Sequence, residues 1–322
     1  MLNPKKANIF ALGMLLFSVF ASFALSFTIV QTSADIEKVQ LISIIVQDLI
    51  IILLPVLFYC TISRTKLSAL IPHERLSGKN MLYIILLTIL FSPIITVISS
   101  VTTIFYPPDI NFELYSYIKE LPLPVSLLAM AIMPAVFEEL AFRGVILNNY
   151  KSVGILKAIL VSGLFFGLFH LDFYQIGYAV AAGIFFSFLV VYTNSIYASV
   201  FSHFLINGTQ VLYTKLIFMI SPETVNAALN ETVSTNNNYQ MIVSGIFFTL
   251  ITTPFLIITS KKFMEYNKNH RVDFELSIFQ ENPSEFEIQI DNIGSRKKGF
   301  IDIYFILYII FSVITAILFS LV

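Results

Sequence analysis

IFALGMLLFSVFASFALSFTIV, residues 9–30, contains no charged side chain. A helix rises 1.5 Å per residue, so this run can form a helix of about 33 Å, enough to cross about 30 Å of hydrocarbon. Lys5 and Lys6 precede it, as basic residues do in a signal peptide. The apolar core of a signal peptide is shorter, about 7–15 residues. We therefore expect residues 9–30 to form a retained first membrane span.

The composition of the whole chain indicates the same environment. The 322 residues are 57% hydrophobic and 12% charged, with a mean hydropathy of +0.83. A soluble domain is about half apolar and about a quarter charged. The net charge of −1 gives no electrostatic reason to expect a nucleic-acid partner. The single cysteine, Cys60, excludes an intrachain disulfide and a cysteine-based zinc cluster within this sequence. The expected surroundings are a lipid bilayer.

Apolar runs of membrane length recur along the chain. They cover residues 8–31, 41–62, 81–105, 123–147, 155–171, 174–193, 196–219, 241–260 and 301–321. Hydrocarbon offers no water to backbone polar groups, so such segments must be helical rather than open sheet. The sequence predicts an all-α fold, a polytopic transmembrane helical bundle of about nine spans (eight to nine). Residues 1–322 are expected to form a single integral membrane domain.

Lysine and arginine residues gather in alternate connections between these runs, which predicts the orientation. They are Lys5 and Lys6; Arg64, Lys66, Arg75 and Lys79; Arg143, Lys151 and Lys157; and Lys261, Lys262, Arg271, Arg296, Lys297 and Lys298. We expect the N-terminus to be cytoplasmic, in what the composition suggests is a bacterial cell membrane. Residues 261–299 are then a polar cytoplasmic loop, with a short strand pair over 272–293 as the alternative.

The fourth run carries an acidic pair, in the stretch MPAVFEELAFR over residues 133–143. On a helix, Glu139 and Arg143 share one face in the favourable acid-before-base order. Glu138 points about 100° away, and Pro134 removes a backbone hydrogen bond and favours a kink. This pattern suggests that Arg143 holds Glu139 while Glu138 faces a cavity. Taken alone, it is equally compatible with the polar end of a helix near the cytoplasm.

Two of the four histidines also lie in apolar runs. His170 follows Phe166 by four residues, and His203 precedes Asn207 by four, so each pair shares a helix face. A lone membrane histidine is usually a hydrogen bond between helices. Two histidines and a glutamate pair on nearby spans favour a functional cluster instead. Gly163 and Gly167 form a G-x-x-x-G pair on the His170 run, which permits close approach of a neighbouring helix.

Two carboxylates, two imidazoles and an amide suit hydrolysis. A carboxylate and an imidazole can hold a water molecule, remove its proton and direct it at a carbonyl carbon. A second imidazole and the amide can donate hydrogen bonds to the oxyanion that forms. The same glutamate and histidine side chains could instead bind zinc and its water. The residues alone leave both mechanisms open.

The motifs together resemble the CPBP family, the CAAX proteases and bacteriocin-processing enzymes, also called the ABI family. The matching motifs are E-E-x-x-x-R at Glu138, Glu139 and Arg143, F-x-x-x-H at Phe166 and His170, and H-x-x-x-N at His203 and Asn207. The resemblance covers residues 123–210, the expected catalytic core spans. It implies a helical intramembrane endopeptidase that opens toward the cytoplasmic leaflet.

The resemblance also implies roles for these residues. Glu138 would be the general base, with His170 helping to hold the attacking water. His203 and Asn207 would form the oxyanion hole, and Glu139, Arg143 and Phe166 would support them. No cofactor is then needed. If the enzyme were zinc-dependent, the ligands would be Glu138, His170 and His203.

Two other classes of function fit the same helices. One is a non-catalytic membrane adaptor or immunity factor, which would have no chemical need for intact motifs. The other is a proton-coupled transporter that relays protons through Glu138 and His170. The sequence shows no inverted repeat to favour a transporter. We expect the partner to be a peptide or a membrane-protein substrate within the lipid bilayer.

Overall fold

The computed structural model describes residues 3–32, 47–106, 121–220, 235–280 and 299–320. Apolar helices dominate these residues. They are α1 (Pro4–Thr32), α3 (Leu54–Ser63), α5 (Gly78–Phe105), the helical stretch Leu123–Val153, α10 (Ile155–Phe169), α11 (Phe173–Thr193), α12 (Ile196–Ile220), α14 (Thr235–Tyr266) and α17 (Ile303–Phe319). Each corresponds to one of the nine apolar runs, although residues 41–46 of the second run lie outside the described residues. The predicted all-α bundle is confirmed.

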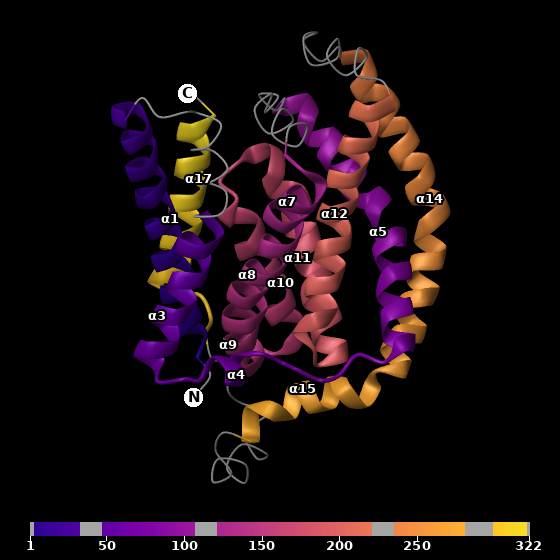
Figure 1. Cartoon of the computed structure of the whole chain (residues 1–322). Helices are drawn as coiled ribbons and strands as arrows, with labels where there is room; N and C mark the ends of the chain where they lie inside the picture. Colours follow the sequence, from indigo (N-terminus) through magenta and orange to yellow (C-terminus); the bar gives the residue numbers. More distant parts are fainter. Residues whose placement is uncertain (1–2, 33–46, 107–120, 221–234, 281–298, 321–322) are drawn as a thin grey trace.

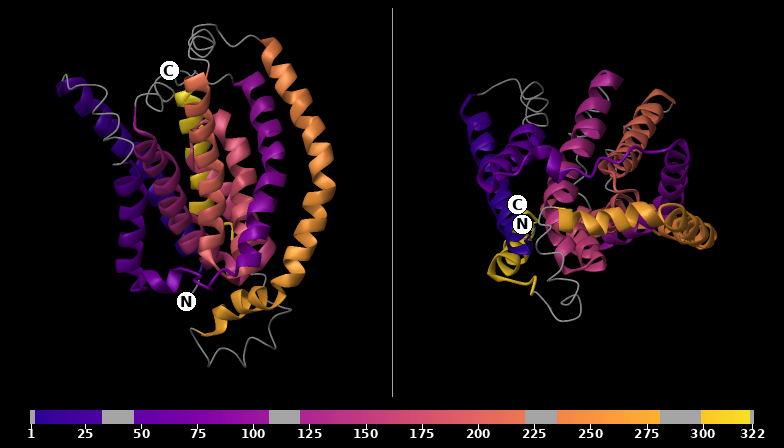
Figure 2. Two further views of the ribbon diagram at one scale, coloured as in Figure 1. Left: turned by 45° about the vertical axis from the view of Figure 1, so that its right-hand side comes forward. Right: turned by 90° about the horizontal axis from the view of Figure 1, so that it is seen from below.

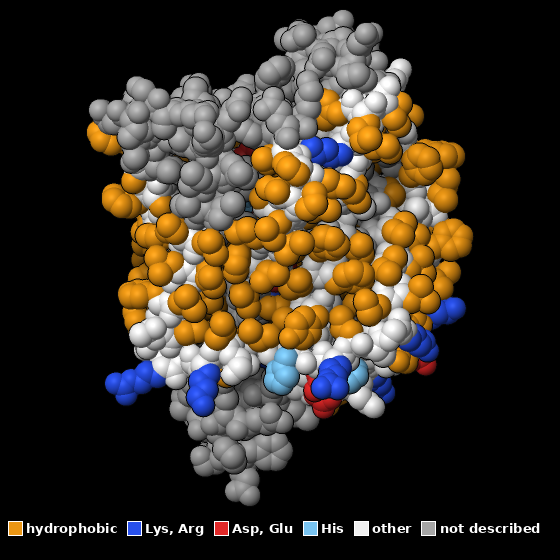
Figure 3. All heavy atoms as spheres, in the orientation of Figure 1, with side chains coloured by type: hydrophobic (Ala, Val, Ile, Leu, Met, Phe, Trp, Pro, Cys, Tyr) orange, Lys and Arg blue, Asp and Glu red, His pale blue; other side chains and the backbone are white. Residues whose placement is uncertain are grey.

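Five of these segments are long and apolar enough to cross a membrane. They are Pro4–Ala24, Gly78–Phe105, Leu123–Val153, Phe173–Thr193 and Ile242–Tyr266. Three shorter apolar helices accompany them, Leu49–Ser63, Ile155–Phe169 and Ile303–Phe319. In Figure 3 a broad belt of hydrophobic side chains covers the described surface, and most of the visible Lys and Arg side chains lie at its lower edge. The protein is an integral membrane protein.

The helical stretch Leu123–Val153 is irregular. It contains α7 (Leu123–Leu127), α8 (Met133–Glu139) and α9 (Asn148–Tyr150), joined by π-helical segments at Leu128–Ile132 and Leu140–Leu147. Such π-helical turns are frequent at functional sites. The first immediately precedes α8 and its Pro134, and the second begins directly after Glu139.

The helices that carry the motifs lie at the centre of the bundle. Figures 1 and 2 show α8, α10, α11 and α12 between α1, α3 and α17 on one side and α5 and α14 on the other. The N- and C-termini lie at opposite ends of the bundle (Figure 1), as an odd number of crossings requires. The orientation relative to the cytoplasm stays a prediction.

Close backbone approach holds α10 against α11. A Cβ atom added at Gly163 would lie 2.6 Å from the backbone nitrogen of Ile184, and one added at Gly167 would lie 2.7 Å from that of Val180. Gly183 meets the Cα of Gly163 from the other helix in the same way, at 2.8 Å. The close approach predicted from the G-x-x-x-G pair is therefore present, with Gly183 as its counterpart on α11.

The polar stretch after α14 differs from its prediction. Helix α14 continues to Tyr266, and α15 (Lys268–Gln280) runs across the base of the bundle (Figures 1 and 2). Phe274 of α15 is fully buried, with the ammonium of Lys151 3.8 Å from its ring centroid. The loop prediction is wrong for residues 261–280, and so is a strand over 272–280; residues 281–298 lie outside the described part. These residues are helical because α15 buries an apolar side chain against the bundle.

Two of the basic residues that we counted as cytoplasmic loop charges are buried instead. Arg143 is fully buried in the centre of the bundle, and Lys151 is 6% exposed. Neither is a free loop charge, so neither contributes to the orientation signal. The remaining described basic residues carry that prediction.

Candidate active site

Glu139 and Arg143 form a buried ion pair near the middle of the helical stretch Leu123–Val153. The Arg143 Nη1 atom donates a 2.7 Å hydrogen bond to Glu139 Oε1, and both side chains are fully buried. Arg143 Nη2 donates to the backbone carbonyl of Gly183 on α11 at 2.9 Å. A buried charge requires such partners, because isolating it costs several kcal/mol. The pair predicted from their four-residue spacing is therefore present, and it also ties α8 to α11.

Two phenylalanine rings enclose the guanidinium of Arg143. Its central carbon lies 4.6 Å from the ring centroid of Phe166 on α10 and 5.3 Å from that of Phe186 on α11. A guanidinium over an aromatic face is attracted by the negative face of the ring. Phe142 meets Phe166 edge-on at 5.1 Å and extends this aromatic packing. Aromatic side chains thus pack around the Arg143 guanidinium.

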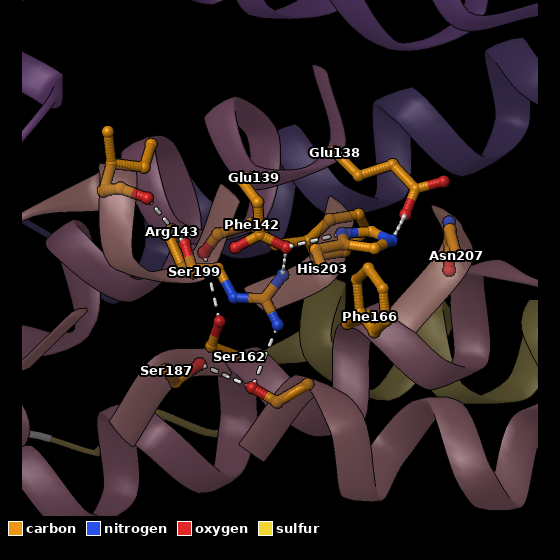
Figure 4. A network of polar contacts seen from close by, with 12 residues as sticks. Glu138, Glu139, Phe142, Arg143, Ser162, Phe166, Ser187, Ser199, His203 and Asn207 are labelled. Carbon is orange, nitrogen blue, oxygen red and sulfur yellow. Dashed lines mark hydrogen bonds and ion pairs between the residues drawn. The ribbon is translucent and has the colours of Figure 1, made fainter. Parts of the chain in front are cut away.

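His203 of α12 lies between the two carboxylates. Its Nδ1 atom is 3.1 Å from Glu139 Oε1, and its Nε2 atom is 3.9 Å from Glu138 Oε2. The Glu138 side chain is 16% exposed, whereas that of Glu139 is fully buried. Figure 4 shows the Glu138 carboxylate and the His203 ring pointing toward each other, with Glu139 on the opposite edge of the ring. The structure therefore brings Glu138, Glu139 and His203 together.

Phe186 orients the His203 ring. The two rings stack at 4.9 Å with an interplanar angle of 20°, and Phe166 contacts the imidazole edge-on at 5.9 Å. One residue before His203, Ser202 shares a 2.7 Å hydrogen bond with Thr88 of α5. Packing and hydrogen bonding thus fix both the imidazole plane and the helix that carries it.

His170 ends α10 on the other side of Phe166. The two ring centroids are 5.0 Å apart, and His170 Nδ1 lies 2.9 Å from the Phe166 carbonyl oxygen. The Phe166 ring also contacts His203, at 5.9 Å between ring centroids, so one aromatic ring separates the two imidazoles. The next residue, Leu171, has a positive φ of 56°, a conformation that costs an L-residue about 1–2 kcal/mol. This turn sets the direction in which α10 presents His170 before α11 begins.

Asn207 hydrogen bonds with the kinked helical stretch. Its Nδ2 atom donates to the backbone carbonyl of Met130 at 3.3 Å. In α-helical register the residue four positions later would donate to that carbonyl, but Pro134 has no N–H. The side chain of Asn207 therefore supplies this carbonyl with a donor that Pro134 cannot supply. An amide nitrogen carries two hydrogens, so this bond engages one donor of the amide.

The donor set at the site does not form a metal cluster in the described part of the chain. No group of three His, Cys, Asp or Glu side chains is placed there to hold one metal ion. A catalytic zinc requires three protein ligands at about 2 Å. Among the described residues, Glu138, His170 and His203, the set that zinc would need, are not placed as such a group.

Reasoning from the sequence missed the contribution of α11. Its backbone carbonyl at Gly183 accepts from Arg143 and from Ser187 Oγ, at 2.9 and 2.8 Å, and its Phe186 stacks on His203. Ser162 of α10 was missed as well; it donates to the carbonyl of Phe142 at 3.1 Å. None of these residues is ionisable, and small and aromatic residues are common in any membrane helix. The sequence held no signal that would distinguish them.

Comparison with known proteins agrees with this geometry. Residues 120–209 match the family described as type II CAAX prenyl endopeptidase Rce1-like. The resemblance to the CPBP family is confirmed. The CPBP match includes every candidate residue from Glu138 to Asn207, and it leaves α1, α3, α5, α14, α15 and α17 unmatched.

A curated relative is described as a membrane peptidase. The chain is 26% identical over 125 residues to "Putative membrane peptidase YdiL" of Bacillus subtilis (strain 168). The similar region is 38% of this chain and 47% of that protein, so the chain spans about half the length of the relative. No solved structure matches the chain significantly.

Proposed function

We propose that the protein is an intramembrane endopeptidase that hydrolyses a peptide bond in a membrane-associated or peptide substrate. The observation that carries the proposal is the placement of Glu138 beside His203, Oε2 to Nε2 3.9 Å, next to the buried Glu139–Arg143 pair. Ionisable groups inside a bilayer cost several kcal/mol unless they are paired or hydrated, so such a cluster is kept for a function.

Glu138 is the general base in this proposal. It is the partly exposed carboxylate of the pair, whereas Glu139 is fully buried and bound by Arg143. Ionised Glu138 accepts a proton from water as the water oxygen bonds to the carbonyl carbon of the substrate. His170, across the Phe166 ring from His203, helps to hold that water.

Asn207 and His203 are the candidate donors to the oxyanion. They lie one turn apart on α12, so both can face the same carbonyl oxygen. In the resting structure one hydrogen of the Asn207 amide is used by the carbonyl of Met130, and the second can be directed at the substrate. Fixed donors of this kind stabilise the charge that develops in the transition state.

The descriptions of the matching family and of the similar protein support the same class of reaction. The matching family is described as a CAAX prenyl endopeptidase, and the similar Bacillus subtilis protein as a membrane peptidase. Both descriptions name a peptidase, and the second places it at a membrane. Since the match covers only the central spans, we carry over the reaction and not the prenylated substrate.

The membrane proteome tests this proposal. Cells producing the wild-type protein and cells producing Glu138→Ala are compared after labelling of new protein N-termini. We expect a small set of N-termini that depends on Glu138. Glu265→Ala, which changes an exposed glutamate of α14, is the matched control and should retain that set. Identical N-termini in wild type and Glu138→Ala would overturn the proposal.

A further inference from the structure

We infer that His203 is the proton carrier of the site, receiving the proton that Glu138 removes from water and passing it to the leaving amine. This inference rests on the proposed protease function. In this role His203 can donate to the oxyanion only after Nε2 has received that proton, so Asn207 is the donor while the water adds to the carbonyl carbon. The geometry of four groups supports the inference: Glu138, Glu139, Arg143 and the ring of Phe186.

Glu139 determines which nitrogen of His203 carries the hydrogen. The Glu139 Oε1 atom accepts a hydrogen bond from Arg143 at 2.7 Å, as expected for an ionised carboxylate beside a buried guanidinium. An ionised carboxylate can only accept hydrogen bonds. His203 Nδ1, 3.1 Å from the same oxygen, must therefore be the donor. In neutral His203 the hydrogen is on Nδ1, and Nε2 presents its lone pair.

The orientation of the ring then directs Nε2 at Glu138. The Nδ1 hydrogen bond and the stacked Phe186 ring hold the imidazole plane, and Nε2 faces Glu138 Oε2 at 3.9 Å. That separation is longer than a direct hydrogen bond and short enough for one bridging water. Catalytic hydrogen bonds are often long without substrate and shorten in the complex. In serine hydrolases a carboxylate also orients an imidazole, and the other ring nitrogen transfers the proton. Here the nucleophile is water instead of a serine hydroxyl.

The proton transfers can be followed to completion. Water gives one proton to Glu138 while its oxygen bonds to the carbonyl carbon and the carbonyl electron pair moves to oxygen. Glu138 passes the proton to His203 Nε2. The resulting imidazolium lies between two carboxylates and donates the proton to the amine nitrogen as the carbon–nitrogen bond breaks. Water and a peptide become a carboxylic acid and an amine, and Glu138 and His203 return to their starting states.

Two carboxylates lie near the two ring nitrogens of His203 and can accept hydrogen bonds from both when the ring is an imidazolium. From the Leu123–Val153 stretch His203 meets Glu138 and Glu139, and Arg143 is bound to the same Glu139 oxygen. From α10, His170 lies across the Phe166 ring, and α11 contributes the uncharged Phe186. An oxyanion donor needs only an N–H, so that role does not require two carboxylates.

Leaving-group dependence distinguishes the two roles of His203. The probes are a peptide with a Glu138-dependent cleavage site and the same acyl portion as a 4-nitrophenyl ester, whose leaving group needs no proton. His203→Asn keeps an N–H but cannot carry a proton. We expect it to lower amide cleavage by on the order of 10²–10³, within the range of general acid–base catalysis, and ester cleavage far less. His73→Asn, in an exposed loop, should leave both rates unchanged. Equal losses on both probes would overturn the inference while leaving the protease function standing.

A measurement on the wild-type protein tests the inference without a substrate. Histidine labelled with ¹⁵N reports which ring nitrogen is protonated, and the chain has only four histidines. The resonance lost in His203→Asn identifies residue 203. We expect the neutral ring to carry its hydrogen on Nδ1. A neutral ring with its hydrogen on Nε2 would contradict the inference, whether or not a substrate is known. Absence of any Glu138-dependent cleavage would instead overturn the proposed function.

Discussion

The Arg143 guanidinium and the Glu139 carboxylate are held 2.7 Å apart, one helical turn from each other, with both side chains fully buried. Glu139 also accepts from His203, and Arg143 also donates to the backbone of α11 at Gly183. The pair therefore joins α8, α11 and α12 at one point. It is both a folding contact and the support on which the His203 imidazole is oriented.

Arg143→Ala should destabilise the protein strongly. Removing one partner of a buried ion pair leaves an uncompensated charge, at a cost of about 3–5 kcal/mol. We expect a lower unfolding temperature in detergent and a lower yield of folded protein. The double variant Glu139→Ala/Arg143→Ala removes both charges and should recover much of that stability, without recovering activity. A single variant as stable as the wild type would show that the pair is dispensable.

Gly167→Ala should separate α10 from α11. The added methyl group would lie 2.7 Å from the backbone nitrogen of Val180, and a backbone atom cannot move aside as a flexible side chain can. Overpacking of this kind costs about 1–3 kcal/mol. Gly13→Ala is the matched control, because its new methyl group meets nothing within 4 Å. The change in unfolding temperature relative to the wild type should differ in sign or size between the two variants. Equal changes would contradict the tight packing of α10 against α11.

Pro134 and Asn207 should be coupled energetically. Asn207→Ala removes the side-chain donor to the part-buried Met130 carbonyl, which costs about 0.5–1.5 kcal/mol, the net value of a typical hydrogen bond. In a Pro134→Ala background the new N–H of residue 134 can donate to that carbonyl. The stability lost on Asn207→Ala should therefore be smaller in that background. Equal losses in the two backgrounds, measured by denaturation of all four proteins, would show that the two residues act independently.

Activity should survive exhaustive chelation. The proposed chemistry uses Glu138 and two imidazoles, and the described residues hold no three-ligand set for zinc. We expect purified protein to contain substoichiometric zinc and to cleave its substrate after treatment with a chelator. Stoichiometric zinc, together with loss of activity on its removal and recovery on its return, would decide for a metalloprotease.

The sequence predicted the fold well because lipid imposes a strong and local constraint. An apolar run of about 20 residues must be a helix in hydrocarbon, whatever its neighbours are. The same reasoning was wrong at residues 261–280, where the polar composition favours a loop. There the helix depends on long-range contacts, such as the packing of Phe274 beneath Lys151. Composition within a short segment does not reveal such contacts.

The residue types of the candidate site could be predicted from the sequence, but most contacts between its side chains could not. Spacing identifies residues that share a face of one helix, which is how Glu139 and Arg143 were paired. It does not say which side chains meet between helices. The resemblance associated Glu138 with His170, whereas the structure places His203 between Glu138 and Glu139. Phe186 and Gly183 could not be found at all, since their roles depend on the packing of α11 against α10.

The most direct test of the central claim is the rate at which purified Glu138→Gln cleaves a peptide that the wild-type protein cleaves. Glutamine keeps the size and hydrogen bonding of Glu138 and removes its basicity. We predict a fall in rate on the order of 10²–10⁴, the range for loss of a general base, with an unfolding temperature close to that of the wild type. Cleavage by Glu138→Gln at the wild-type rate would contradict the assignment of Glu138 as the base, and with it the site described above.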